Sequence, residues 1–122
     1  MNNTTISGNL TRDPEIKYLG DGAAKAEFGV AVNRRWQDRQ TGEWVESTSF
    51  FNVVAWRDLA ENIVLSLSKG SRVVVSGRLE QRSWTDDNDR VRSQVEIVAD
   101  DVAVSLRFSS LTMGEQSESE YA

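Results

Sequence analysis

The sequence contains no cysteine, no histidine and only one proline. Without cysteine, the chain can form neither a disulfide nor a thiolate-ligated metal site. Without histidine, it lacks the commonest general base and the commonest metal ligand. No apolar run approaches the roughly 20 residues of a membrane span, and residues 1–4 do not resemble the start of a signal peptide. We therefore expect a cytoplasmic protein without a metal or cofactor.

The net charge of −5 argues at first against a polyanionic ligand. However, residues 110–122 hold three glutamates and no lysine or arginine, and without them the chain has 14 basic and 16 acidic residues. A nearly neutral domain can bind phosphates when its charges are segregated on one face, because the local potential governs the encounter. The net charge of the chain therefore neither supports nor excludes a polyanionic ligand.

Alternating apolar residues predict strands over 4–11, 25–33, 44–56, 71–84 and 91–99, with a bent continuation of the first over 15–19. A further alternation predicts a short extra strand over 102–108. The chain length fits one domain, which we place at residues 1–109. Residues 110–122 are polar and acidic, so we expect a disordered tail.

One helix is predicted between the strands over 44–56 and 71–84. Asp58 and Glu61 have the spacing of a capping box, and the apolar residues that follow recur at helical spacing. Lys69 and Gly70 are expected to form its basic last turn and its stop. Three strands, a helix and two more strands give the element order of an OB-fold, a five-stranded barrel that binds oligonucleotides or oligosaccharides.

Tryptophans and arginines gather between residues 34 and 84, which hold all four tryptophans. Because side chains two apart on a strand share a face, Phe50 and Trp56 lie on one side of their segment, and Trp84 lies with Arg78 and Arg82. Exposed rings among guanidinium groups suit a ligand with flat faces and negative charge, which describes single-stranded nucleic acid. The alternative is that the rings fill a core and the arginines are solvated.

Several motifs, in order and spacing over 4–99, resemble the bacterial single-stranded DNA-binding protein family, and the short tail suggests an actinobacterial type of paralogue. They are Gly8-Asn9-Leu10, Asp13-Pro14-Glu15, Trp36 with Thr41-Gly42-Glu43, Val53-Val54 with Leu59-Ala60-Glu61, Lys69-Gly70-Ser71, Gly77-Arg78-Leu79 and Trp84-Thr85-Asp86. The resemblance implies a homotetramer of OB domains that binds single-stranded DNA without sequence preference, in replication, repair or recombination at the nucleoid.

The resemblance places the base-stacking aromatics at Trp36, Phe50, Trp56 and Trp84. Strict alternation puts Trp36 on the buried side with Phe28, so its exposure requires a bulge or a strand end. Trp44 matches no stacking position, and we expect it to pack or to contact the loop. We assign phosphate contacts to the arginines of the same region: Arg34, Arg35, Arg39, Arg57, Arg72, Arg78, Arg82 and Arg92. Lys69 is a weaker candidate.

The family's usual acidic tip, which ends in Ile-Pro-Phe, is absent from the final residues, Glu118 to Ala122. Recruitment of replication and repair enzymes is therefore in doubt. The strand over 102–108 resembles a terminal strand that clamps a neighbouring subunit in some members, and its alternative is an edge strand of its own barrel.

Two other functions compete with the DNA-binding interpretation. An OB-fold module for protein interaction in replication restart would place the aromatics in a subunit interface. An enzyme acting on nucleic acid would need acidic pairs such as Asp86-Asp87 or Asp100-Asp101 to hold Mg²⁺. Extended backbone puts the two members of each pair on opposite faces, which disfavours the enzyme.

Overall fold

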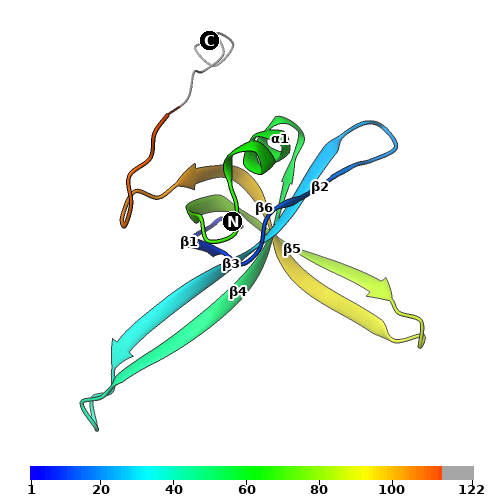
Figure 1. The fold of residues 1–122 in the computed structure, drawn as a ribbon. Coiled ribbons are helices and arrows are strands. Elements are labelled where there is room, and N and C mark those ends of the chain that lie inside the picture. Colours follow the sequence, from blue (N-terminus) through cyan, green and yellow to red (C-terminus); the bar gives the residue numbers. More distant parts are fainter. Residues whose placement is uncertain (114–122) are drawn as a thin grey trace.

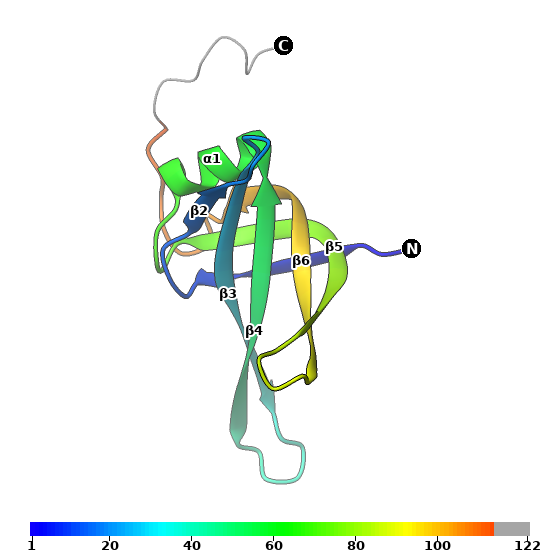
Figure 2. The ribbon, with the colours of Figure 1, turned by 90° about the vertical axis from the view of Figure 1, so that its right-hand side faces the viewer.

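Six strands and one helix make up residues 1–113, the part of the chain that the computed structural model describes. The elements are β1 (Thr4–Leu10), β2 (Glu15–Tyr18), β3 (Ala24–Gln37), β4 (Trp44–Trp56), α1 (Arg57–Ser66), β5 (Arg72–Thr85) and β6 (Val91–Val104). The strand order is β1-β5-β6-β4-β3-β2, and pairing of β1 with β3 closes a barrel of five strands, with β2 added outside (Figure 2). The predicted OB-fold is confirmed.

The barrel interior is filled by the apolar residues of the predicted alternation. Phe28 and Val30 of β3, Val53 of β4 and Val75 of β5 are fully buried. Helix α1 covers one end of the barrel (Figure 2), and this segment contributes three buried side chains to the same core: Ala60, Ile63 and Leu67. Within residues 1–113, no helix is both long and apolar enough to cross a membrane.

Two glycines let the barrel strands approach one another closely. A methyl group at Gly8 would overlap the carbonyl oxygen of Ala31, and one at Gly77 would overlap that of Val98. Gly77 lies beside the one register shift in the β5–β6 pairing, where Ser76 is opposite Asp101 and Gly77 is opposite Ala99. The extra residue, Asp100, bends β6 around the barrel.

The helix ends differ from the prediction. The N-cap is Trp56, without a side-chain capping bond, and Asp58 lies inside the first turn. There its carboxylate still interacts favourably with the positive end of the helix dipole. The helix stops at Ser66, so Lys69 and Gly70 belong to the turn before β5. Tertiary hydrogen bonds fix that turn: Lys69 N–H donates to Asp13 Oδ1 (2.7 Å) and Gly70 N–H to the Leu10 carbonyl (2.9 Å).

The expected extra strand over 102–108 has a different form in the structure. Its first half is the end of β6, with Val104 opposite Val73. Beyond Val104, residues 105–113 form no strand, and Ser105 N–H donates to the Arg72 carbonyl (2.9 Å). Leu106 and Phe108 are exposed. Residues 114–122, most of the expected disordered tail, lie outside the described residues.

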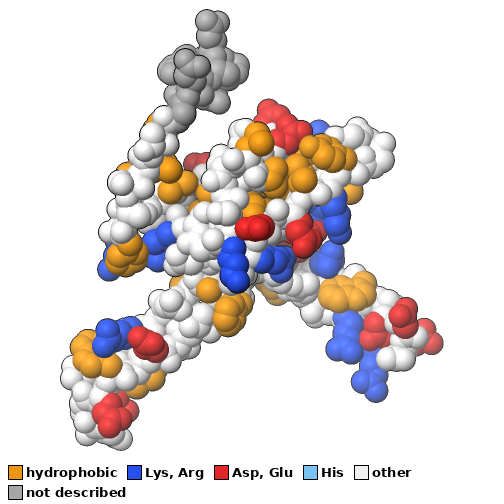
Figure 3. Space-filling model, in the orientation of Figure 1, with side chains coloured by type: hydrophobic (Ala, Val, Ile, Leu, Met, Phe, Trp, Pro, Cys, Tyr) orange, Lys and Arg blue, Asp and Glu red, His pale blue; other side chains and the backbone are white. Residues whose placement is uncertain are grey.

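Two long hairpins extend beyond the barrel in different directions (Figure 1). The β3–β4 hairpin, which we call the arm, is paired out to Gln37 opposite Trp44. The β5–β6 hairpin is paired out to Thr85 opposite Val91. Apolar, basic and acidic side chains lie along both of them (Figure 3). These hairpins carry most of the residues predicted to bind DNA.

Candidate nucleic-acid interface

Strand register places the candidate residues of four strands on one surface, which we call the outer face. Residues directly opposite each other on neighbouring strands share a face. Trp56 is opposite Lys25, Asn52 is opposite Glu96, and Trp84 is opposite Arg92. The charged, aromatic and amide side chains of the outer face include Lys25, Glu27 and Arg35 of β3; Trp44, Glu46, Phe50, Asn52 and Trp56 of β4; Arg78, Glu80, Arg82 and Trp84 of β5; and Arg92, Gln94 and Glu96 of β6.

Three of the four predicted stacking aromatics lie on the outer face, and all three are exposed to solvent. Phe50 is 72% exposed, Trp84 41% and Trp56 36%. The exposed part of each ring is accessible to a ligand, and every nucleobase offers it a flat partner. These three rings are therefore available to stack bases.

Trp36 lies on the opposite side of the arm. It is opposite Val45 and shares its phase with the buried Phe28, as alternation predicts. The β3–β4 pairing runs without a register shift from Lys25–Trp56 to Gln37–Trp44, so no bulge turns the ring around. Trp36 is exposed because the arm extends past the end of the barrel.

A positive side chain lies over each of the three tryptophan rings predicted to stack bases. Lys25 Nζ is 5.5 Å from the centre of the Trp56 ring, and the Arg82 guanidinium carbon is 5.1 Å from that of Trp84. Arg34 covers Trp36 at 5.1 Å. Such cation–π contacts orient the ring and hold a charge beside it. A base stacked on the ring would have its phosphate near that charge.

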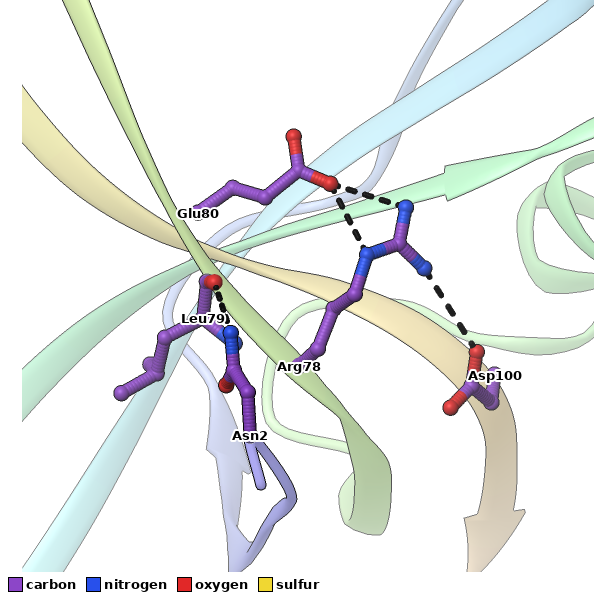
Figure 4. A network of polar contacts seen from close by, with 5 residues as sticks. All are labelled: Asn2, Arg78, Leu79, Glu80 and Asp100. Atoms are coloured by element: carbon purple, nitrogen blue, oxygen red, sulfur yellow. Dashed lines mark hydrogen bonds and ion pairs between the residues drawn. The ribbon is translucent and has the colours of Figure 1, made fainter.

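Two of the predicted phosphate-binding arginines are already paired with carboxylates. Arg78 contacts Glu80 at 2.8 Å and Asp100 at 3.9 Å, and lies between them in Figure 4. Arg92 Nε donates to Asp86 Oδ2 at 2.8 Å.

Beside Arg78, the Asn2 side chain donates to the Leu79 carbonyl (2.8 Å) and accepts from its N–H (2.9 Å), which ties the N-terminus to β5 (Figure 4).

The other arginines divide between the outer face and other surfaces. Arg35 and Arg82 lie on the outer face and form no ion pair within residues 1–113. Arg72 is half-buried and donates to Ser7 Oγ (3.1 Å) and Asn9 Oδ1 (3.4 Å), so its contacts are structural. The remaining three are exposed away from the outer face: Arg34 on the opposite side of the arm, Arg39 in its loop and Arg57 at the start of α1.

A polar groove of about 280 Å³ lies in the centre of the outer face. Its polar lining residues are Arg12, Glu27, Asn52, Arg82, Gln94 and Glu96. A hydrogen bond from Lys25, at 3.0 Å, holds the pKa of Glu27 below its ordinary value. Glu27 is therefore ionised but paired with Lys25, and the groove carries two arginines beside its two glutamates. Its amide and carboxylate groups can bond the edges of bases. Sequence reasoning missed this groove because its lining residues come from distant segments.

Trp44 is the residue that sequence reasoning expected to pack or to contact the loop. The structure does not show packing, because the ring is 59% exposed at the start of β4 and lies on the outer face. The Arg35 guanidinium carbon is 4.7 Å from the ring centre. The signal was available: Trp44 is an even number of residues from Phe50 on one strand, so the two share a face.

No group of three or more acidic residues within residues 1–113 is arranged to hold a metal ion. A closed five-stranded barrel with exposed aromatics and arginines on one face defines an OB-fold binding protein of the nucleic-acid-binding class.

Comparisons with known proteins identify the family. The model of the single-strand binding protein family matches residues 1–105, and this chain belongs to that family. It is 44% identical over 116 residues to the single-stranded DNA-binding protein of Mycobacterium tuberculosis, covering 94% of this chain and 71% of the relative. The protein of the same name from Mycolicibacterium smegmatis is 43% identical over 94% of this chain and 70% of its own. The suspected resemblance is confirmed.

A solved structure has the same fold. A Plasmodium falciparum SSB in complex with ssDNA aligns with a TM-score of 0.81 and 30% sequence identity, over 86% of this chain and 95% of that one. The family and the relatives are named for binding, and the protein is not an enzyme. The comparisons do not favour the protein-interaction module.

Proposed function

We propose that this protein binds single-stranded DNA without sequence preference, stacking bases on exposed aromatic rings and contacting phosphates with arginines. The observation that carries the proposal is the outer face, where strand register brings Phe50, Trp56 and Trp84 together with Arg82. Stacking ignores base identity because every base has a π-face. The names of the relatives and of the structural neighbour support the same ligand.

The proposed ligand path runs along the groove, which Asn52 and Arg82 line. Phosphates would follow the basic side chains beside the rings, and base edges would face the polar groups around Asn52. Trp36 is a separate stacking position on the other side of the arm, supported by the family pattern and by its exposure.

Self-association also forms part of the proposal. Within the described residues, Thr4–Gly8 of β1 pair with β5 only, because β3 pairs with β1 only at Asn9 and Leu10. An unpaired strand edge can join the same edge of a second copy in a two-fold pair. The homotetramer rests on the family resemblance, as do the roles in replication, repair or recombination at the nucleoid.

The test is a fluorescence titration of the protein with a thymidine homopolymer and with duplex DNA of matched length, at two salt concentrations. We expect quenching by the single strand that weakens with added salt. Trp56→Ala and Trp84→Ala should each weaken binding by about 1–3 kcal/mol with little change in salt dependence. Leu65→Ala, an exposed change on α1, serves as the control. Unchanged affinity in both tryptophan variants would overturn the stacking assignment.

A further inference from the structure

We infer that Trp44 and Arg35 form an additional base-stacking position near the end of the arm, which extends the DNA path beyond the barrel. This inference rests on the proposed function. It concerns how far a bound strand reaches along the arm, because Phe50 and Trp56, which we call the central rings, lie nearer the barrel on β4 than Trp44.

The Trp44 ring has the same chemistry as the central stacking positions. Its exposed fraction, 59%, exceeds those of Trp56 and Trp84, and Arg35 lies over it at 4.7 Å. Arg35 forms no ion pair within residues 1–113, so its charge remains available to a phosphate. The position therefore offers one flat face and one positive charge side by side.

Strand register makes Trp44 continuous with the central rings. Trp44, Phe50 and Trp56 are six residues apart in turn on β4, so they project from the same face. At about 3.3 Å per residue, six residues span about 20 Å, which about six nucleotides cover at the roughly 3.4 Å spacing of a DNA strand. A strand stacked on Phe50 would reach Trp44 without changing sides.

The arm loop holds Trp44 in place before any ligand arrives. Asp38 N–H donates to the Glu43 carbonyl and Gly42 N–H to the Asp38 carbonyl, both at 2.8 Å. The Asp38 carboxylate also accepts from Gln40 N–H (2.8 Å), and Gly42 has a φ of 73°, which favours glycine. Because these bonds close the loop directly before β4, the backbone that carries the ring is ordered before DNA binds, which lowers the entropic cost of binding.

The test measures the affinity of the full chain for two thymidine oligomers, one of about 6 and one of about 16 nucleotides, within the range of sites on one OB-fold. Trp44→Ala should bind the long oligomer about 5- to 150-fold more weakly and the short one unchanged, because the short one fills only the central rings. Trp44→Phe keeps a ring and should restore most of the affinity.

The control variant is Tyr18→Ala, which removes an aromatic ring of similar exposure, 62%, from the other phase of the β2–β3 pair. It should bind both oligomers like the wild type. Equal affinity of Trp44→Ala and wild type for the long oligomer would overturn the inference. A Trp44→Ala variant that changes the oligomeric mass without changing the affinity for either oligomer would also overturn it, because Trp44 would then be a subunit contact. The stacking assignment of the proposed function fails separately, if Trp56→Ala and Trp84→Ala both leave the affinity unchanged.

Discussion

The guanidinium of Arg92 is held by the carboxylate of Asp86, across the turn of the β5–β6 hairpin. Arg92 Nε donates to Asp86 Oδ2 at 2.8 Å, while Asp86 Oδ1 accepts from the N–H groups of Asn88 (2.9 Å) and Arg90 (3.0 Å). These bonds hold the pKa of Asp86 below its ordinary value, and the bond from Arg92 has the largest effect. One arginine of the outer face is thus neutralised by its own hairpin.

Asp86→Asn should therefore strengthen DNA binding. The amide keeps the Oδ1 acceptor for the turn but removes the charge that holds Arg92, so the arginine becomes available to a phosphate. We expect the slope of log K against log salt to steepen by about 0.7, the value for one further phosphate neutralised on a single strand. The matched control is Asp87→Asn, which removes the same charge from the neighbouring position. Equal slopes in the two variants would contradict the release of Arg92.

Arg82 should contribute more to phosphate binding than Arg78. Arg78 already contacts Glu80 and Asp100, whereas Arg82 forms no ion pair within residues 1–113. We expect Arg82→Ala to flatten the salt dependence by about 0.7, because one phosphate of the single strand is no longer neutralised, and Arg78→Ala to flatten it less. Arg82→Lys keeps the charge and should retain the slope. A larger effect of Arg78→Ala would show that the Glu80 ion pair opens when DNA binds.

Local periodicity accounts for most of what could be predicted of the fold and the site. Phe28 and Val53 are buried, and Phe50 and Trp56 share the outer face, because alternation along a strand depends only on backbone geometry. The same rule places Trp44 on the face of Phe50, but the family pattern assigns Trp44 no stacking role, which leads to the expectation of packing or loop contact.

Other features depend on contacts between distant segments, so the sequence could not show them. Lys25 lies over Trp56 because β3 and β4 pair in one particular register. The helix ends at Ser66, before Gly70, because the following turn bonds to Leu10 and Asp13. Trp36 is on the phase that alternation predicts, and its exposure follows from the length of the arm.

The ion pair between Glu27 and Lys25 should add a small pH-dependent contribution to stability. The folded-state pKa of Glu27 is lowered, chiefly by the Lys25 hydrogen bond. The contribution is therefore present above the unfolded-state pKa, about 4.3, and is lost as pH falls through the lower folded-state value. It should be about 0–1 kcal/mol, as for a surface pair.

Thermal unfolding of Glu27→Gln and wild type, from about pH 6 to about pH 3, checks this expectation. The difference between the two midpoints should shrink as the pH falls, because the wild type loses an interaction that the variant never had. Glu61→Gln, an exposed change on α1 with no ion pair within residues 1–113, is the control. A difference that stays constant with pH would contradict the assignment.

Gly77 should be necessary for closing the barrel at the bend of β6. A methyl group there would overlap the Val98 carbonyl oxygen and lie 2.9 Å from Ala99 Cα, and both neighbours are backbone atoms that cannot rotate away. Gly77→Ala should therefore lower the free energy of unfolding by about 1–3 kcal/mol, the cost typical of overpacking. Denaturant unfolding measures the change. Gly20→Ala is the control, because a methyl group at that loop position meets no atom within 4 Å. If Gly77→Ala is as stable as Gly20→Ala, the β5–β6 approach is looser than the structure shows, and the register shift at Asp100 does not depend on the glycine.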